Sequence, residues 1–298
     1  MKRIKHYIRN STQYLLTWML LDALYLPALL LLTPWTAGLS TAEFFMAHGF
    51  AIAVGSIVMF TGVGGGMLWI PLLTLMEVKP SEAVFISIFT QLAGKGMGSV
   101  TYLLKGLVDV RVARYFVPYA LFGTLVGYVS GFFISAGYER ILIYIFVLAA
   151  TYLLLRMLHS LYHDPLERDK VFDADAMRHS RLIVMGSSFF TGLLSIGNSD
   201  WLVPHMERKL KMQTVRAVAT GLFVMFTTLV FFLVLTAGSI GLGLRDWPAT
   251  TPLLFATCSG VMLGGQIGTR LIRYQWLRER QKHAFILVLA LSIIHLLW

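Results

Sequence analysis

Apolar blocks long enough to cross a membrane constrain this sequence more than any other feature. Three of them are Tyr14–Leu32, Ile141–Leu155 and Val218–Ala237. Each approaches or exceeds the roughly 20 residues that a helix needs to cross a hydrocarbon core of about 30 Å. Charged residues make up only 13% of the chain, about half the share usual in soluble domains. The sequence therefore predicts an all-α polytopic membrane protein with no room for a soluble catalytic domain.

The charge of the chain indicates contact with lipid. A net charge of +10 would favour nucleic acid in a soluble protein, but in a membrane protein Lys and Arg collect in cytoplasmic loops and touch anionic lipid. Lys2, Arg3, Lys5 and Arg9 precede an apolar run of about nineteen residues, which is too long for a typical signal peptide. We expect a retained first helix at about 13–34, with the N-terminus in the cytoplasm.

Two segments of the chain resemble each other and predict an internal repeat. The block TGVGGGMLWIP runs from Thr61 to Pro71, and TGLLSIGNSDWLVP runs from Thr191 to Pro204. Their opening residues are 130 positions apart and their closing prolines 133 apart. Two glycine triplets follow at an offset of 137, each with a spacing of four: Gly123, Gly127 and Gly131, then Gly260, Gly264 and Gly268. An ordered but drifting offset is expected after duplication with small insertions.

The distribution of Lys and Arg predicts how each repeat enters the membrane. Residues 44–76 are mostly apolar but interrupted by glycines and Pro71, so they form either one broken crossing or two half-helices that return to one side. Four full crossings per unit would leave fifteen basic residues in cytoplasmic loops and nine outside. Re-entrant pairs would leave twenty-one basic residues in cytoplasmic loops and three outside, a far stronger bias toward the cytoplasmic side. Each re-entrant pair is then followed by three transmembrane helices, which makes the two units inverted repeats.

This interpretation divides the chain into four parts. We expect a basic cytoplasmic N-terminus and extra transmembrane helix at 1–42, a first repeat at 43–161, a cytoplasmic linker at 162–180 and a second repeat at 181–298. The linker is the only strongly charged stretch of any length. The single Cys258 rules out a disulfide framework.

The glycine-broken segments are the first candidate site. A break leaves backbone N–H and C=O groups inside the membrane, where only protein, water or a ligand can bind them. Half-helix N-termini offer partial positive charge suited to an anion. We therefore predict that Gly64, Gly65 and Gly66 contact a bound solute. The alternative is close helix packing through small residues, the role we assign to Gly94, Gly98 and both glycine triplets.

The second break is more polar and contributes Asn198, Ser199 and Asp200. A carboxylate at this depth needs a partner or a proton. Asp200 could couple transport to protons, balance a buried cation or cap the following half-helix. These three interpretations stay open at this point.

Lys95 is the sharpest single signal in the sequence. Ser87, Gln91, Lys95 and Ser99 recur at a spacing of four and so share one face of a predicted helix from about 81 to 104. An ammonium near the middle of a membrane is costly, so it is usually paired or lines an aqueous path. We predict that Lys95 neutralises an anionic substrate, with hydrogen bonds from Gln91 and Ser99. The alternatives are an ion pair between Lys95 and Asp200 or snorkelling of the side chain to an interface.

These motifs resemble those of the TauE/SafE family of sulfite exporters. The resemblance rests on GVGGGMLWIPLL, SEAVFISIFTQLAGKG and PYALFGTLVGYVSG, and it covers roughly residues 45–275. It implies a multi-pass carrier in a bacterial inner membrane, driven by an ion gradient. The expected solutes are sulfite, sulfoacetate, other organosulfonates and related oxyanions. The second break, GLLSIGNSDWLVP, departs from the family pattern because it lacks the triple glycine.

The leading interpretation is secondary transport, most simply export, of a small anion coupled to protons or sodium ions. A membrane scaffold or assembly factor that transports nothing is the alternative. No nucleophile motif, phosphate loop or metal-ligand spacing occurs in the sequence, so we expect no enzyme, no cofactor and no metal site. Membrane lipid is an expected partner, nucleic acid is not, and a homo-oligomer is left open.

Overall fold

The computed structural model describes residues 40–61, 65–135, 139–163, 174–244 and 251–271, with scattered positions between 283 and 296. These residues form helices and turns, and no strand occurs among them, which confirms the all-α prediction for this part of the chain. The helices are α2 (Thr41–Thr61), α3 (Gly66–Leu75), α4 (Pro80–Leu104), α5 (Val110–Ser135), α6 (Glu139–His163), α7 (Ala174–Leu194), α8 (Ser199–Arg208), α9 (Thr214–Gly241) and α10 (Thr251–Leu271).

Two predicted segments are only partly covered by the described residues. The expected extra helix at 13–34 lies outside them. The expected linker at 162–180 contains the end of α6 and the start of α7, while 164–173 lies outside the described residues.

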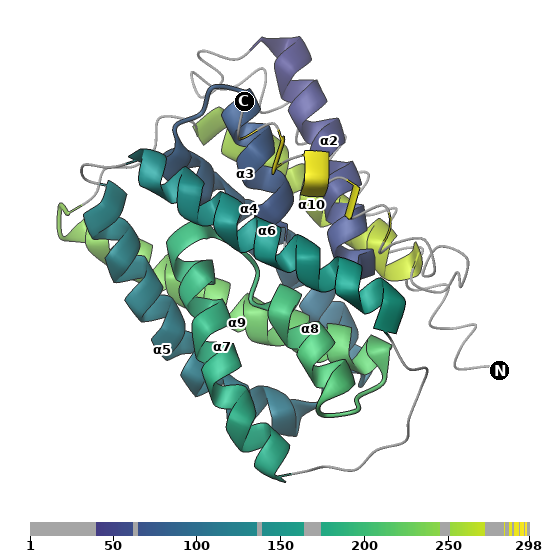
Figure 1. Cartoon of the computed structure of the whole chain (residues 1–298). Helices are drawn as coiled ribbons and strands as arrows, with labels where there is room; N and C mark the ends of the chain where they lie inside the picture. The colour runs from purple at the N-terminus through teal and green to yellow at the C-terminus, as the bar shows by residue number, and fades with distance from the viewer. Residues whose placement is uncertain are drawn as a thin grey trace.

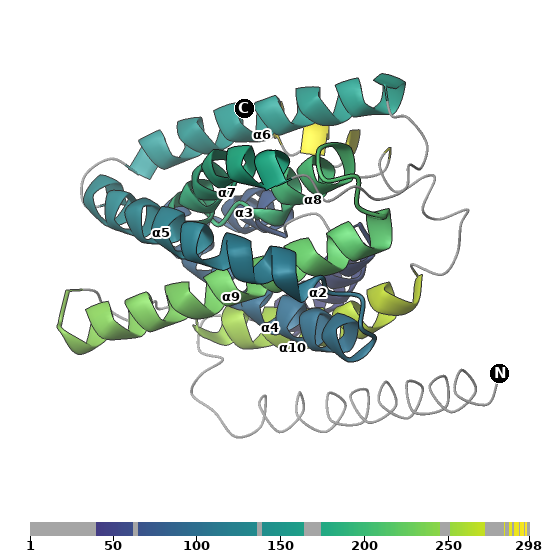
Figure 2. The ribbon, with the colours of Figure 1, turned by 90° about the horizontal axis from the view of Figure 1, so that it is seen from below.

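Several helices suit a membrane. By length and composition, Thr41–Met59 in α2, Val110–Ile134 in α5 and Thr214–Gly241 in α9 are able to cross one, and Arg140–Leu155 in α6 is a shorter apolar stretch. Helix α6 crosses the front of the bundle in Figure 1 and lies along one edge in Figure 2. Its exposed face is apolar and carries Ile141, Tyr144, Leu148, Tyr152 and Leu155. Because these residues recur every three or four positions, they form one stripe that suits lipid and would be unfavourable in water.

The chain reverses direction between α2 and α3. Phe50 lies in the middle of α2, and Trp69 lies one turn into α3, yet their ring centroids are only 6.4 Å apart. A continuous helix would separate the two residues by about 28 Å, at 1.5 Å per residue. The glycine-broken segment therefore makes a hairpin, in which the short helix α3 runs back along α2.

The second broken segment reverses in the same way. The Oγ atom of Ser180, in the first half of α7, lies 2.7 Å from Nε2 of His205 near the end of α8. The chain thus runs inward along α7, breaks at 195–198 and returns along α8. This connection lies in the interior of the bundle (Figure 1), and residues 191–200 are all buried.

The first glycine triplet fits α5 against α7. An ideal Cβ built on Gly123 would lie 2.2 Å from the carbonyl oxygen of Met185, and one built on Gly127 would lie 2.1 Å from that of Phe189. Gly131 is looser, with Leu193 at 3.5 Å. No side chain larger than hydrogen fits at the two tight positions, so the packing role predicted for this triplet is confirmed.

The second triplet fits α10 against α2 at the same spacing. The corresponding distances are 2.5 Å from Gly260 to the carbonyl oxygen of His48, 2.2 Å from Gly264 to that of Ile52 and 2.3 Å from Gly268 to that of Ser56. Small residues that let helix backbones touch are the usual solution inside a membrane. The glycine triplet of each half therefore packs against a helix of the other half, α5 against α7 and α10 against α2.

Helices α4 and α9 pack against each other between these two pairs. Helix α4 also contacts α3 and α10, and α9 also contacts α5 and α8. Gly94 and Gly98 of α4 make the expected close contacts, with an ideal Cβ 3.2 Å from Val261 and 2.1 Å from Met59. One group of buried polar residues lies where α4 and α9 meet the two helix breaks.

Candidate functional site

The two helix breaks touch each other in the interior. An ideal Cβ on Gly66, the first residue of α3, would lie 1.8 Å from the carbonyl oxygen of Ser195 in the second break. Only glycine allows the two backbones to come this close. Gly65 is less confined, because the nearest atoms to its ideal Cβ are Gln91 Cγ at 3.2 Å and Trp69 Cδ1 at 3.3 Å. Gly64, predicted with them, lies outside the described residues.

Ser195 fixes the geometry of the second break. It directly follows α7 with φ of 59°, the left-handed conformation that glycine usually adopts after a helix. Its Oγ atom donates to Ser87 Oγ at 2.9 Å, and Gln91 Nε2 lies 2.7 Å from that Oγ and 3.0 Å from the Ser195 carbonyl oxygen. Helix α4 thus holds the break through two side chains of its polar face.

Lys95 lies one turn further along α4 and is fully buried. Its ammonium donates to Gln91 Oε1 at 3.2 Å and to the thioether sulfur of Met225 on α9. The Asp200 carboxylate, 7% exposed, interacts with it electrostatically. Lys95 therefore points into the bundle, and the alternative of snorkelling to an interface is wrong. A role in charge balance with Asp200 is compatible with this geometry. The two remaining interpretations of Lys95, neutralisation of an anionic substrate and an ion pair with Asp200, both stay open.

The start of α8 carries the other polar groups. Asn198 Nδ2 donates to Ser188 Oγ at 3.1 Å and to Thr228 Oγ1 at 3.0 Å. The Thr228 hydroxyl in turn donates to the Val224 carbonyl at 2.7 Å, so it accepts from Asn198 and fixes the orientation of the amide. The Oδ1 atom of Asn198 is buried and accepts no hydrogen bond from the described part of the chain.

Neither half-helix is capped by a side chain of its first residues. Gly65 precedes α3 and Asn198 precedes α8, and no side-chain capping bond is formed at either end within the described residues. The cap interpretation of Asp200 stays a prediction, because this observation concerns only the side chain of Asn198 at the N-cap position. Two buried helix N-termini keep their partial positive charge available to a ligand.

Seven of the predicted site residues come together, and one lies apart. The seven are Gly65, Gly66, Gln91, Lys95, Asn198, Ser199 and Asp200, joined by the contacts above and by the bond from Ser199 Oγ to Met225 Sδ at 3.4 Å. Ser99 is buried one turn beyond Lys95, and its hydroxyl donates to the Leu222 carbonyl on α9 at 3.2 Å. Its hydrogen bond therefore serves the α4–α9 contact.

Sequence reasoning missed Ser195 and Met225 as members of this cluster. Ser195 stood within the quoted second break and only its conformation was hidden. Met225 lies in an unbroken apolar run and carries no local signal. The internal repeat provides a signal instead. An offset of about 134 positions, which lies between the offset of the breaks and that of the glycine triplets, pairs Gln91 with Met225.

The two buried histidines of the described residues, His48 and His205, make hydrogen-bonding contacts between helices. His48 Nδ1 lies 3.0 Å from the Ala256 carbonyl and 3.0 Å from Ser259 Oγ, which ties α2 to α10. His205 contacts Ser180 as described above, while His295 lies outside the described residues. Among the residues that the structure covers, no group of three or more His, Cys, Asp or Glu side chains is placed to hold a metal ion.

Comparison with known proteins adds an independent finding. Residues 47–296 match the family model described as "Sulfite exporter TauE/SafE". The chain is also 25% identical over 230 residues to "Probable membrane transporter protein YjnA" of Bacillus subtilis (strain 168), which covers 73% of this chain and 87% of the relative. No solved structure matches the chain.

Proposed function

The chain belongs to the TauE/SafE sulfite exporter family and is a multi-pass membrane transporter, and from that premise we propose that it exports a small oxyanion. Sulfite, sulfoacetate and other organosulfonates are the solutes that we propose, with a proton or sodium gradient as the driving force. The proposed location is the inner membrane of a bacterium, with the N-terminus in the cytoplasm.

One observation carries the proposal of an anionic solute: the buried ammonium of Lys95 beside two uncapped helix N-termini. An ammonium with no exposed surface is unfavourable in a membrane unless negative charge balances it. Asp200 supplies that charge in the structure described here. A solute oxyanion that binds Lys95 would take over this role and release the carboxylate to bind a proton or a cation. The arrangement thus supports coupling between anion and cation movement.

Helix packing supports the proposal of inverted repeats. Gly123 of the first half lies against Met185 of the second, and Gly260 of the second half lies against His48 of the first. The two glycines are 137 positions apart, and so are His48 and Met185. Exchanging the halves therefore reproduces the contact, as expected for two units related by a two-fold axis in the membrane plane. The repeats that we propose are 43–161 and 181–298.

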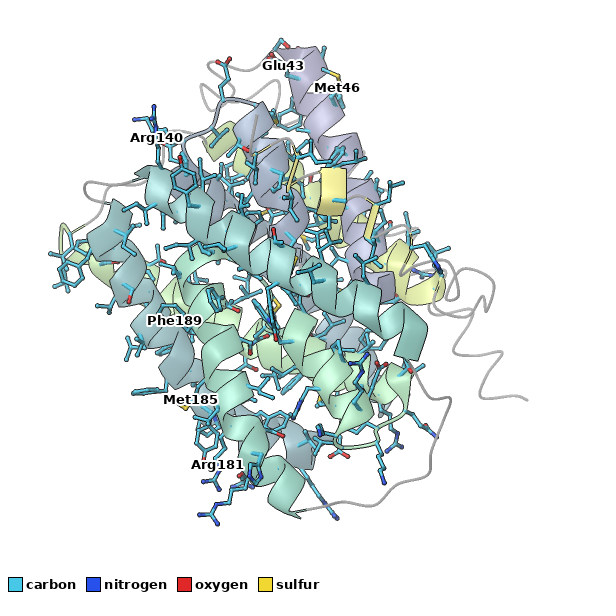
Figure 3. All side chains as sticks on the ribbon, in the orientation of Figure 1. Glu43, Met46, Arg140, Arg181, Met185 and Phe189 are labelled. Atoms are coloured by element: carbon cyan, nitrogen blue, oxygen red, sulfur yellow. The ribbon has the colours of Figure 1, made fainter. Side chains whose placement is uncertain are left out.

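The orientation of the two hairpins supports the same proposal. Figure 3 labels Glu43 in the first turn of α2 at the top of the bundle and Arg181 in the first half of α7 at the bottom. Two units inserted in the same sense would begin at the same end. Because α3 runs back along α2 and α8 runs back along α7, this orientation supports our proposal of re-entrant pairs that enter from opposite sides.

A flux assay tests the transport proposal. Purified protein in liposomes should move radiolabelled sulfite or sulfoacetate, and a pH or sodium gradient should accelerate the movement. Lys95→Ala should abolish flux while the protein remains monodisperse, and Lys95→Arg should restore it only partly because a guanidinium differs in shape from an ammonium. Lys79→Ala, which changes an exposed lysine just before the same helix, is the matched control. Wild-type flux by the Lys95→Ala protein would contradict the proposal.

A labelling assay tests the inverted arrangement. In a Cys258→Ala background, a cysteine that replaces Glu77 should react with an impermeant reagent from the periplasmic side. A cysteine that replaces Arg178 should react only after the membrane is opened. Reaction of both positions from one side would exclude the inverted arrangement and leave the transport proposal untouched.

A further inference from the structure

Helix α9 places one sulfur atom among the polar groups of the site. Met225 is fully buried, and two donors converge on its Sδ atom: the Lys95 ammonium and, at 3.4 Å, the hydroxyl of Ser199. The two donors come from different helices, α4 and α8. Their convergence on one atom is unusual for a side chain that only packs in a core.

A thioether is a poor partner for these donors. Its sulfur is a weak acceptor, whereas an ammonium carries three protons and prefers charged or carbonyl oxygens. Of the acceptors that the structure gives Lys95, Gln91 Oε1 at 3.2 Å is the only neutral oxygen among the described residues. An anionic oxygen at the place of Met225 Sδ would accept both bonds and lie beside the first residue of α8, where the partial positive charge of that helix is largest.

We propose that Met225 is a specificity-determining residue whose thioether occupies the place that an oxygen of the bound oxyanion takes in the loaded carrier. This inference rests on the proposed function and adds a residue to it. A methionine side chain has three rotatable bonds and adapts to different surroundings, so it is suited to leave when the solute arrives and to return when the solute departs. In the unloaded protein, the sulfur gives Lys95 a second acceptor beside Gln91 Oε1 and accepts the hydrogen bond of the Ser199 hydroxyl.

The Met225 sulfur and the solute oxygen compete for the same place. This competition predicts whether each substitution raises or lowers the affinity for the solute. Met225→Leu keeps an apolar side chain of similar size but removes the acceptor. The unloaded state then loses a bond that the loaded state does not make, so the solute should bind more tightly, by about a few-fold because the bond to a thioether is weak. Met225→Gln puts an amide oxygen, a better acceptor, at the same reach and should weaken binding by a similar factor.

Binding of sulfite and of sulfoacetate to the purified full-length protein tests this, with chloride as the comparison anion. The measured quantity is the dissociation constant, obtained from the rise in melting temperature as the ligand concentration increases and confirmed by half-saturation of liposome flux. Met206→Leu changes another fully buried methionine, on α8, and controls for the loss of a methionine as such. Opposite shifts for Leu and Gln with no shift for the control would support the proposal.

Three outcomes would overturn the inference, and one of them would also overturn the proposed function. Equal affinity in all variants would mean that Met225 only packs. Weaker binding in both the Leu and the Gln variants would mean that the sulfur contacts the solute directly instead of competing with it. If the unmodified protein binds no oxyanion at all, the proposed function itself fails, and the inference fails with it. Should Met225→Leu not fold, the Met225→Gln protein still decides between competition and packing.

Discussion

The two helix breaks have the same hairpin geometry but different chemistry. In the described part of the first break, Gly65 and Gly66 contribute backbone alone and lead into an apolar half-helix. The second break contributes Ser195, Asn198 and Ser199 and leads into a half-helix with Asp200 in its first turn. The first break thus allows the two backbones to approach closely, and the second break provides the polar groups. In the site that we propose, these two contributions are thus divided between the halves.

Of the substitutions that test this difference between the breaks, Gly66→Ala should have the largest effect on stability and flux. Its Cβ would lie 1.8 Å from the Ser195 carbonyl oxygen and 2.6 Å from the carbonyl carbon. Both are backbone atoms held by Gln91, so the breaks would have to move apart. We expect a loss of about 3 kcal/mol or more in stability and no flux, measured as the fraction of monodisperse protein after heating in detergent and as sulfite movement in liposomes. Wild-type stability would show that the two breaks do not touch.

Ser195→Ala should have the next largest effect, and Ser195→Gly should be milder. Both variants lose the hydroxyl that binds Ser87 and Gln91, at a cost of about 1–3 kcal/mol. Alanine must also keep φ near 59°, whereas glycine adopts that conformation freely. The glycine variant should therefore be more stable than the alanine variant by about 1 kcal/mol, as measured by thermal inactivation. The reverse order would mean that the conformation of Ser195 is not strained.

Gly65→Ala should have a smaller effect than either change. The atoms that its Cβ meets, Gln91 Cγ at 3.2 Å and Trp69 Cδ1 at 3.3 Å, belong to side chains that can shift by a few tenths of an ångström. We expect a loss of about 1 kcal/mol in stability and reduced but measurable flux. Because Gln91 holds both Ser195 and Lys95, a change in solute affinity that exceeds the change in stability would show that the first break acts on the site through this glutamine.

Gly186→Ala should have the smallest effect and the opposite sign. This glycine lies within α7, two turns before the second break, and its ideal Cβ meets nothing within 4 Å. Alanine favours a helix interior over glycine by about 1 kcal/mol, so stability should rise slightly and flux should stay unchanged. A loss of flux in this variant would indicate that α7 needs flexibility far from the break itself.

The parts of this molecule that follow a repeating pattern could be predicted from its sequence. The spacing of four along Ser87, Gln91 and Lys95 placed these residues on one buried face, and the two glycine triplets indicated close helix packing. Both predictions depend on helical periodicity, which is a local property of the chain. Gly64 and the expected helix at 13–34 lie outside the described residues, so the predictions about them stay open.

Long-range geometry accounts for what the sequence did not reveal. The contact between Gly66 and the Ser195 carbonyl joins residues more than a hundred positions apart, and no local pattern reports such a distance. Ser99 shares the polar face of α4 but binds a backbone carbonyl of α9, because its place along the helix lies beyond the breaks. Met225 was hidden for a similar reason, since only the fold brings its sulfur to Lys95.

The glycine contacts between halves have a consequence for how the protein is made. Helix α2 leaves the ribosome long before α10, its main partner, and α5 likewise precedes α7. The glycines that contact α2 belong to α10, so α2 enters the bilayer before its main packing partner has been made. The contact between α2 and α10 is therefore made late in biosynthesis, only after α10 has been inserted.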